Sequence, residues 1–152
     1  MPRKLRFVIV PLAAIAFLAV SGCGDKGIKL VKISGTVKYN DGTPVRGGSE
    51  QGHAIITFSP ANFDAEPAAG QGHKGASAMI DAEGRYAMAT LLRQADGVIP
   101  GDYKVIIRVW EKDGDASSTL IPEKYGDREA TDLKITVDKP RTDADFTVEK
   151  IR

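Results

Sequence analysis

The sequence predicts an all-β fold, and more specifically a seven-stranded antiparallel Greek-key β-sandwich. Two observations lead to this prediction. From Tyr103 to Trp110 every second residue is apolar, directly after a turn at Pro100-Gly101-Asp102, which is the pattern of a central strand. Several other short runs have the same period of two, and no amphipathic helical pattern follows residue 22. Because each alternating strand has an apolar face to bury, two stacked sheets are the economical packing.

The other strands are expected between turn signals along the chain. Residues 54–59 are apolar on both faces, so this strand is expected inside its sheet. Residues 76–80 and 85–90 flank Asp81-Ala82-Glu83-Gly84 and are expected to form a hairpin. Gly35, in the middle of the first strand, indicates a bulge or a close backbone approach. The remaining strands are expected at residues 31–39, 133–137 and 144–148.

The N-terminus has the layout of a secretory signal. Basic residues at positions 3, 4 and 6 precede an apolar run over residues 7–20, which is shorter than the roughly 20 residues of a membrane-spanning helix. Val20-Ser21-Gly22-Cys23 resembles the bacterial lipobox, in which the signal is cut before a lipid-modified cysteine. We therefore expect a lipoprotein signal peptide at 1–22, a lipidated tether at 23–30 and one domain at 31–152.

Cys23 is the only cysteine, and it is the predicted lipidation site, carrying acyl chains such as palmitate. The alternative is an incidental thiol behind an ordinary signal peptide. A single cysteine cannot form an intramolecular disulfide, so the core must hold the domain together. Gly24 stands where the inner-membrane retention signal of enteric bacteria has Asp. We expect a membrane-anchored protein of the cell envelope, in the outer membrane, facing the periplasm or the surface.

The charge balance argues against nucleic acid as a partner. Lys and Arg number 21 against 20 Asp and Glu, and no block of like charge is present. Removing residues 1–22 takes away three basic residues and no acidic ones, which leaves 18 basic side chains against 20 acidic ones.

Four turn-and-strand motifs follow one another along the chain: Ser34-Gly35-Thr36-Val37, residues 41–48, residues 81–86 and residues 100–105. In order and spacing they resemble the carboxypeptidase regulatory-like, transthyretin-like domain, over about residues 31–149. Together with the lipobox and Ile121-Pro122-Glu123-Lys124-Tyr125, the chain resembles small lipoproteins of planctomycetes. The resemblance implies a seven-stranded Greek-key β-sandwich in the envelope that acts as an accessory or adhesive module. Residues 61–75, rich in Ala, Gly and Pro, are an insertion relative to the minimal domain of this family. They are expected to form a surface loop.

The sequence does not predict an enzyme. Asp81 and Glu83 could be an acid–base pair, but in a hairpin turn carboxylates are more often solvated turn formers. The transthyretin-like fold also includes a purine-pathway hydrolase with a C-terminal Tyr-Arg-Gly-Ser motif, whereas this chain ends Val148-Glu149-Lys150-Ile151-Arg152. No Gly-x-Ser-x-Gly elbow occurs, and we expect no cofactor.

No metal site is expected either. His53 and His73 could be combined with Asp64, Glu66 or Asp81, but no metal-ligand spacing is present. A calcium site could be imagined from the turn carboxylates Asp41, Asp81, Glu83 and Asp102, but they do not form an EF-hand-like run.

Trp110 is the candidate ligand-binding residue, because exposed aromatic side chains stack on sugars or anchor partners. The alternative is that Trp110 covers the open end of the sandwich. The first functional hypothesis is a non-enzymatic, lipid-anchored envelope module with a structural or adhesive role, contacting an envelope protein or polysaccharide. The second is an extracellular carbohydrate- or peptide-binding lipoprotein that uses Trp110 and the 61–75 loop.

Overall fold

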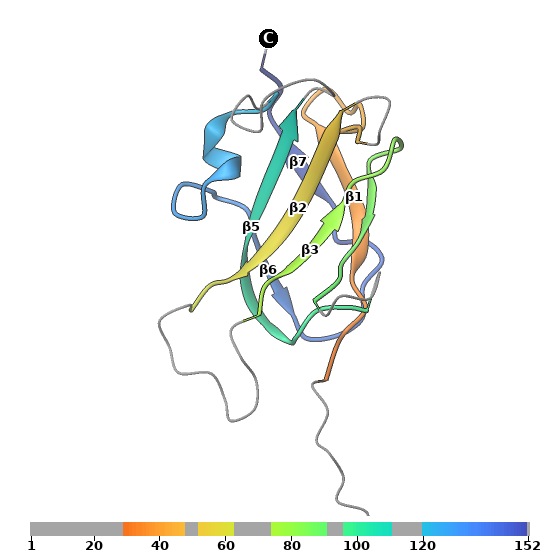
Figure 1. Ribbon diagram of the computed structural model, residues 1–152, viewed down its shortest axis with the longest axis vertical. Coiled ribbons are helices and arrows are strands. Elements are labelled where there is room, and N and C mark those ends of the chain that lie inside the picture. The colour runs from red at the N-terminus through yellow and green to blue at the C-terminus, as the bar shows by residue number, and fades with distance from the viewer. Residues whose placement is uncertain (1–28, 48–51, 63–73, 91–95, 111–119, 152) are drawn as a thin grey trace, which may run out of the picture.

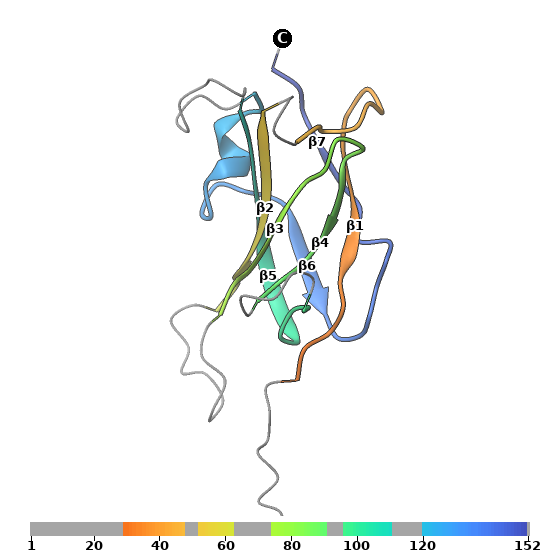
Figure 2. The same cartoon turned by 45° about the vertical axis from the view of Figure 1, so that its right-hand side comes forward.

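The computed structural model describes residues 29–47, 52–62, 74–90, 96–110 and 120–151. These residues form two β-sheets stacked as layers, which confirms the all-β prediction (Figure 1, Figure 2). The one helical element among them is a short 3₁₀ turn, η1 (Glu123–Gly126). The strands are β1 (Ser34–Tyr39), β2 (His53–Pro60), β3 (Ala76–Met79), β4 (Arg85–Ala87), β5 (Gly101–Trp110), β6 (Lys134–Val137) and β7 (Phe146–Val148).

The smaller sheet has the strand order β4-β1-β7 and the larger sheet the order β3-β2-β5-β6. Every pair is antiparallel except β1 and β7, which run parallel with Val37 beside Phe146. The prediction of a wholly antiparallel sandwich is therefore wrong at this pair. The reason is the crossover at residues 138–145: β6 ends at the pole where β1 begins, so the next strand runs in the same direction as β1 (Figure 1).

The central strand is where the alternation predicts it. β5 lies between β2 and β6, and β2 lies between β3 and β5, so both strands are interior to the larger sheet. Tyr103, Val105, Ile107 and Val109 of β5 are buried between the two layers. The alternate residues of β5 face outward, so this sheet buries one face and leaves the other partly open.

Phe58 of β2 lies at the centre of the core and is fully buried. Its ring contacts Tyr86, Tyr103 and Phe146, with ring centroids 6.4, 5.9 and 6.0 Å away. Burial raises the pKa of Tyr86, whose hydroxyl donates a 2.5 Å hydrogen bond to the Ala144 carbonyl. These aromatic residues come from both sheets, so they join the two layers.

Gly35 marks a close backbone approach, one of its two predicted roles. A Cβ atom at this position would lie 2.2 Å from the Ala144 carbonyl oxygen. The chain before β7 is fixed there by Asp145, whose carboxylate accepts hydrogen bonds from the Thr36 amide at 2.7 Å and the Thr36 hydroxyl at 2.8 Å. The parallel strand pair therefore depends on the absence of a side chain at residue 35.

The prediction that residues 76–90 form a hairpin is wrong, because their two strands belong to different sheets. β3 pairs with β2 in the larger sheet and β4 pairs with β1 in the smaller sheet. Beyond the turn, where the Asp81 amide donates to the Arg85 carbonyl, the two segments pair only at one isolated bridge, between Ser77 of β3 and Ala89 just after β4. The segment therefore links the two layers along one side of the sandwich (Figure 2).

The 120–133 segment covers the other side, beside β5. Leu120 donates its amide to the Val109 carbonyl at 2.5 Å, and the Val105 amide donates to the Leu133 carbonyl at 2.9 Å. Tyr125 of η1 is buried, and its neighbour Lys124 binds Glu149, beyond β7, at 2.8 Å. This segment closes the gap between β5 and β7.

Candidate functional site

Trp110 is the last residue of β5 and lies on the outer face of the larger sheet. It is opposite His53 of β2 in the strand register, and the two rings are tilted by 38° to each other with centroids 5.7 Å apart. Both side chains are half-buried. The alternation of β5 directs Trp110 away from the core, on the opposite side from the buried Val109.

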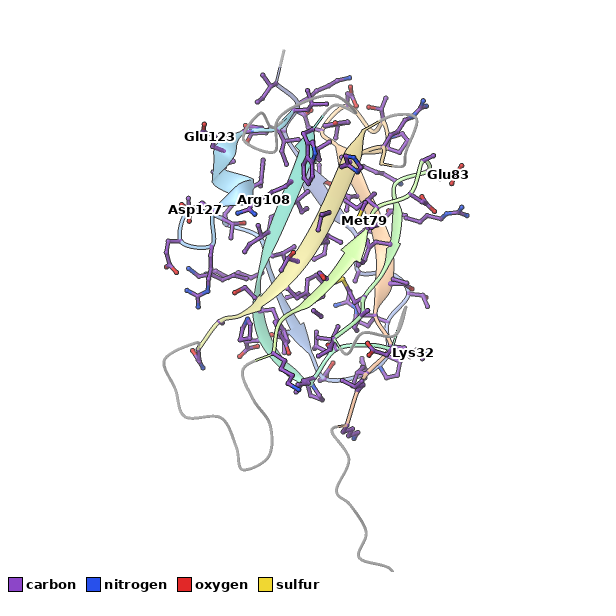
Figure 3. The ribbon with its side chains drawn as sticks, viewed as in Figure 1. Lys32, Met79, Glu83, Arg108, Glu123 and Asp127 are labelled. Atoms are coloured by element: carbon purple, nitrogen blue, oxygen red, sulfur yellow. The ribbon has the colours of Figure 1, made fainter. Side chains whose placement is uncertain are left out.

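Three further apolar side chains lie on the same outer face. Ile55 of β2 is opposite Met79 of β3, and Ile106 of β5 is a diagonal neighbour of Ile55. Met79 is 53% exposed, whereas Ile55 and Ile106 are half-buried (Figure 3). We call His53, Ile55, Met79, Ile106 and Trp110 the outer apolar patch. An apolar cluster on a solvent-facing sheet is typical of an interaction surface.

Arg108 provides a charged group beside the patch. Its guanidinium donates a 2.9 Å hydrogen bond to the Gly126 carbonyl, which holds the side chain toward η1 (Figure 3). Thr57, between Ile55 and Ser59 on β2, adds a half-buried hydroxyl to the same face. The patch therefore combines partly exposed apolar side chains with polar groups at its margin.

The 61–75 loop, the second element of the predicted ligand site, is described only at its two ends. Its first residues are held by Arg128, whose guanidinium donates hydrogen bonds to the Pro60 and Ala61 carbonyls at 2.9 and 3.1 Å and to the Ser59 hydroxyl at 3.1 Å. Residues 63–73, including His73, Asp64 and Glu66, lie outside the described residues.

Cys23 and the whole of residues 1–28 also lie outside the described part of the chain. In the part that is described, no helix has both the length and the apolar character needed to cross a bilayer.

The carboxylates that could have formed an acid–base pair are engaged in a turn. Asp81 accepts hydrogen bonds from the amides of Glu83 and Arg85 and from the Arg85 guanidinium, at 3.0, 2.8 and 3.0 Å. Partial burial acts to raise the pKa of Asp81, but the hydrogen bonds to Arg85 and Glu83 outweigh it, so the pKa lies below its usual value. Glu83 binds the same guanidinium at 2.9 Å. The geometry is that of a fixed turn.

The other turn carboxylates have local partners as well. Asp41 accepts a 2.5 Å hydrogen bond from the Thr43 hydroxyl, which lowers the pKa of Asp41, and Asp102 accepts one from the Thr136 hydroxyl at 2.6 Å. Within the described ranges, no group of three or more His, Cys, Asp and Glu residues is arranged to hold a metal ion.

A groove that the sequence does not reveal runs along the β3 and β4 side of the sandwich. It has a volume of about 930 Å³ and is lined by residues of β1 to β4 and by Thr142. A smaller crevice of about 210 Å³, lined by Lys32 and Arg141 among others, shares Ser34, Ala87 and Thr142 with it. The available signal was the small side chains of Ser34, Thr36 and Ala87 at outward strand positions, and it is weak, because small residues are common on any exposed strand.

Comparison with known proteins adds no relative: no family model, no curated protein and no solved structure matches the chain. The assignment of function therefore depends on the chain's own motifs and geometry.

Proposed function

We propose that this chain is a lipid-anchored, non-enzymatic module of the cell envelope, whose β-sandwich makes structural or adhesive contacts with other envelope components. The observation that carries the proposal is Val20-Ser21-Gly22-Cys23 at the end of a basic and then apolar leader. The sandwich suits this role because its aromatic core joins both sheets without a disulfide.

The seven-stranded Greek-key architecture of the carboxypeptidase regulatory-like type is part of the same proposal. In its support, the family-like motifs coincide with turns that need a positive φ angle: Gly42 follows β1 with φ 84°, and Gly84 precedes β4 with φ 80°. Strands that are distant in sequence are also neighbours, as β2 is of β5 and β1 of β7, which is typical of Greek-key connections.

The arrangement of the sandwich agrees with a tether at one pole. The described chain enters β1 at one pole, and the C-terminus leaves at the opposite pole, toward which β5 runs (Figure 1). If Cys23 holds the chain to a membrane, the outer apolar patch extends from the middle of the molecule to the far pole, where Trp110 ends β5.

The test is to express the full chain in a diderm bacterium and to compare it with the Cys23→Ser variant. We expect the mature N-terminal peptide of the unchanged chain to begin at Cys23 and to carry a diacylglycerol and a fatty acid by mass spectrometry. The variant should retain residues 1–22 and carry no acyl chain at position 23. A Ser21→Ala variant, which keeps a small residue before the cysteine, should be processed normally. An unmodified Cys23 in the mature protein would refute the proposal.

A second candidate function, binding of an extracellular carbohydrate or peptide at Trp110, is favoured by the outer apolar patch. The neighbouring rings of Trp110 and His53 offer aromatic surface on the outer face, and Arg108 and Thr57 supply polar groups beside it. Trp110 is the only tryptophan, so a change in its fluorescence on titration with glycans reports on this site alone. Glycan binding that survives Trp110→Ala would exclude the patch as the site.

A further inference from the structure

β6 is the edge strand of the larger sheet, and among the described strands it pairs with β5 alone (Figure 1). The Val105 amide donates to the Leu133 carbonyl, so the odd-numbered residues of this segment bond to β5. In an antiparallel pair the alternate residues direct their N–H and C=O groups away from the partner strand. Those of Lys134 and Thr136 therefore point out from the edge of the sheet.

These outward backbone groups are open to another chain. Within the described residues, no backbone hydrogen bond reaches Lys134 or Thr136 from the side away from β5. Such groups require partners from water or from a further strand. Proteins commonly place a lysine on an open edge to discourage pairing, and Lys134 is in that position. A lysine discourages only those strands that do not carry an opposite charge in the matching place.

The side chains along this edge alternate regularly. Ile135 and Val137 are buried, whereas Lys134, Thr136 and Asp138, the residue directly after the strand, are exposed. The exposed residues are therefore positive, neutral and negative in chain order. When this segment pairs antiparallel with a second copy of itself, Thr136 opposite Thr136 places Lys134 of each copy opposite Asp138 of the other. Opposite charges in such cross-strand pairs are stabilising, so the edge is complementary to itself.

The other registers open to this edge are poorer. Because only even-numbered residues direct their backbone groups outward, an even residue must bond to an even residue of the second copy. Lys134 opposite Lys134 brings like charges together, which is unfavourable. Lys134 opposite Thr136, or Thr136 opposite Asp138, leaves the charges without an opposite partner in the pairing. Of these registers, Thr136 opposite Thr136 is the one that matches both charges.

The charges within one copy favour the same arrangement. Lys134 lies directly opposite Lys104 of β5, and Lys104 binds Glu129 at 3.1 Å. Within the described residues, neither Lys134 nor Asp138 forms an ion pair. A carboxylate from a second copy would offset the repulsion between the two lysines.

The other end of the edge is acidic on its outer face. Asp102 lies opposite Thr136 and accepts a 2.6 Å hydrogen bond from its hydroxyl. Asp102 and Asp138 therefore both attract the lysine that a second copy brings to this end. Lys139, the residue after Asp138, lies near Asp143, because after the larger effect of Arg141 it also contributes to lowering the pKa of Asp143.

From these observations we propose that β6 pairs antiparallel with β6 of a second copy of this chain, about a two-fold axis at Thr136. The two larger sheets then form one continuous sheet, and the two pairs of Lys134 with Asp138 set the register. A contact of this kind uses the same surface on both copies, so it closes as a dimer and does not extend into a fibre. The pairing goes beyond the proposed function, because it requires neither the lipid nor Trp110.

The test is disulfide cross-linking of Thr136→Cys in the full-length chain, extracted from a diderm bacterium in a non-ionic detergent. All variants also carry Cys23→Ser, so that the introduced thiol is the only one whether or not residue 23 is lipidated. Directly opposite, hydrogen-bonded residues have Cα atoms about 5.5 Å apart, a separation that a disulfide spans. We expect mild oxidation to convert most of the Thr136→Cys chain to dimers. Thr147→Cys, exposed on β7, should give at most about a tenth as much.

Charge exchange tests the register. In the Thr136→Cys chain, Lys134→Asp and Asp138→Lys each place like charges opposite each other, and each should lower the dimer yield at least about fivefold. Mixing these two variants, marked with different epitope tags, should restore the yield as mixed dimers. In a mixed dimer every charge at position 134 faces the opposite charge at position 138.

Three results would overturn the proposal. The first is a Thr136→Cys chain that forms no more dimer than Thr147→Cys, with an unchanged urea midpoint showing that it is folded. The second is a disulfide to a different envelope protein in place of the dimer, which would make that protein the occupant of the edge. The third is a dimer yield that neither charge variant changes, which would exclude the register with Thr136 opposite Thr136.

Discussion

Gly35→Ala tests how β1 and β7, the first and last strands, are held together in the smaller sheet. The new methyl group would lie 2.2 Å from the Ala144 carbonyl oxygen and 2.5 Å from its carbon, which are backbone atoms that cannot rotate away. The segment at Ala144, just before β7, must therefore move away from β1. That movement lengthens the Tyr86 hydroxyl bond to Ala144 and disturbs the bonds between Thr36 and Asp145.

The expected magnitude follows from these contacts. Forcing one methyl group into a closely packed site costs about 1–3 kcal/mol, and weakening one buried hydrogen bond adds about 1 kcal/mol. We therefore expect the free energy of unfolding to fall by about 2–4 kcal/mol. The assay is urea unfolding of the full chain in detergent micelles, followed by the fluorescence of Trp110, the single tryptophan.

Two comparison variants make the result specific. Gly126→Ala places its Cβ 3.6 Å from the flexible Arg108 side chain, an ordinary contact, and should change the stability by no more than about 0.5 kcal/mol. Tyr86→Phe leaves the Ala144 carbonyl without its donor and should cost about 1–3 kcal/mol. Because Gly35→Ala and Tyr86→Phe act on the same carbonyl, the double variant should lose less than the sum of the two. A Gly35→Ala chain as stable as the unchanged one would refute this account of the β1 and β7 contact.

Three further predictions follow from other contacts. Phe58→Ala should destabilise the chain by about 3–5 kcal/mol in the same urea assay because it empties the centre of the core, whereas the outward-facing Thr57→Ala should change it by about 0.5 kcal/mol or less. Arg128→Ala should raise the hydrogen-exchange rate of the Ala61 amide, which bonds to the Asp102 carbonyl at 2.8 Å, because the Pro60 and Ala61 carbonyls lose their guanidinium; an unchanged rate would show that Arg128 does not hold this segment. The pKa of Asp81 is lowered in the folded chain, so its contribution to stability is complete above the unfolded pKa of about 3.9 and disappears as the pH falls through the lower folded value. The urea midpoints of the unchanged chain and Asp81→Asn should accordingly differ at pH 7 and converge toward pH 2.5, and a constant difference would contradict this.

The local structure was largely readable from the sequence, since alternation of apolar residues has a direct physical cause. Tyr103, Val105, Ile107 and Val109 must share one face of an extended strand, and that face must be buried. The same reasoning placed residues 54–59 inside a sheet. The turn residues Asp41 and Gly42 were recognisable because their conformational preferences are intrinsic to them.

The pairing of strands was harder to predict from the sequence, because alternation shows which face of a strand is buried but not which strand lies beside it. Residues 76–90 satisfy the local rules of a hairpin, and their two ends do pair. Between the ends, however, β3 pairs with β2 and β4 pairs with β1 instead of with each other. The parallel pair of β1 and β7 depends on where the crossover at 138–145 reaches the other sheet, and no local signal encodes that position. Gly35 was the one hint of it.

The same distinction between local pattern and strand pairing applies to the candidate sites. Trp110 could be singled out because an aromatic side chain at an outward strand position is conspicuous in a sequence, but its contact with the His53 ring could not, since residue 53 becomes its neighbour only through the register of β2 and β5. The groove is still harder to foresee. Ser34, Thr36 and Ala87 lie together in its lining only because β1 and β4 are adjacent, and Thr142 joins them from a distant part of the sequence.

The opening between Met79 of β3 and Ala87 of β4, both in the lining of the groove, is itself a consequence of the sandwich. Paired strands lie about 4.8 Å apart, whereas the layers of a sandwich lie about 10 Å apart. Strands that follow one another across a short turn but belong to different layers can pair only where the layers converge, which here is at Ser77 and Ala89 and again at the turn. Between these points β3 pairs with β2 and β4 pairs with β1, so the backbone groups of Met79 and Ala87 that would complete a hairpin do not bond to each other. The existence of the groove therefore depends on topology, because a regular hairpin over residues 76–90 would close the opening between Met79 and Ala87.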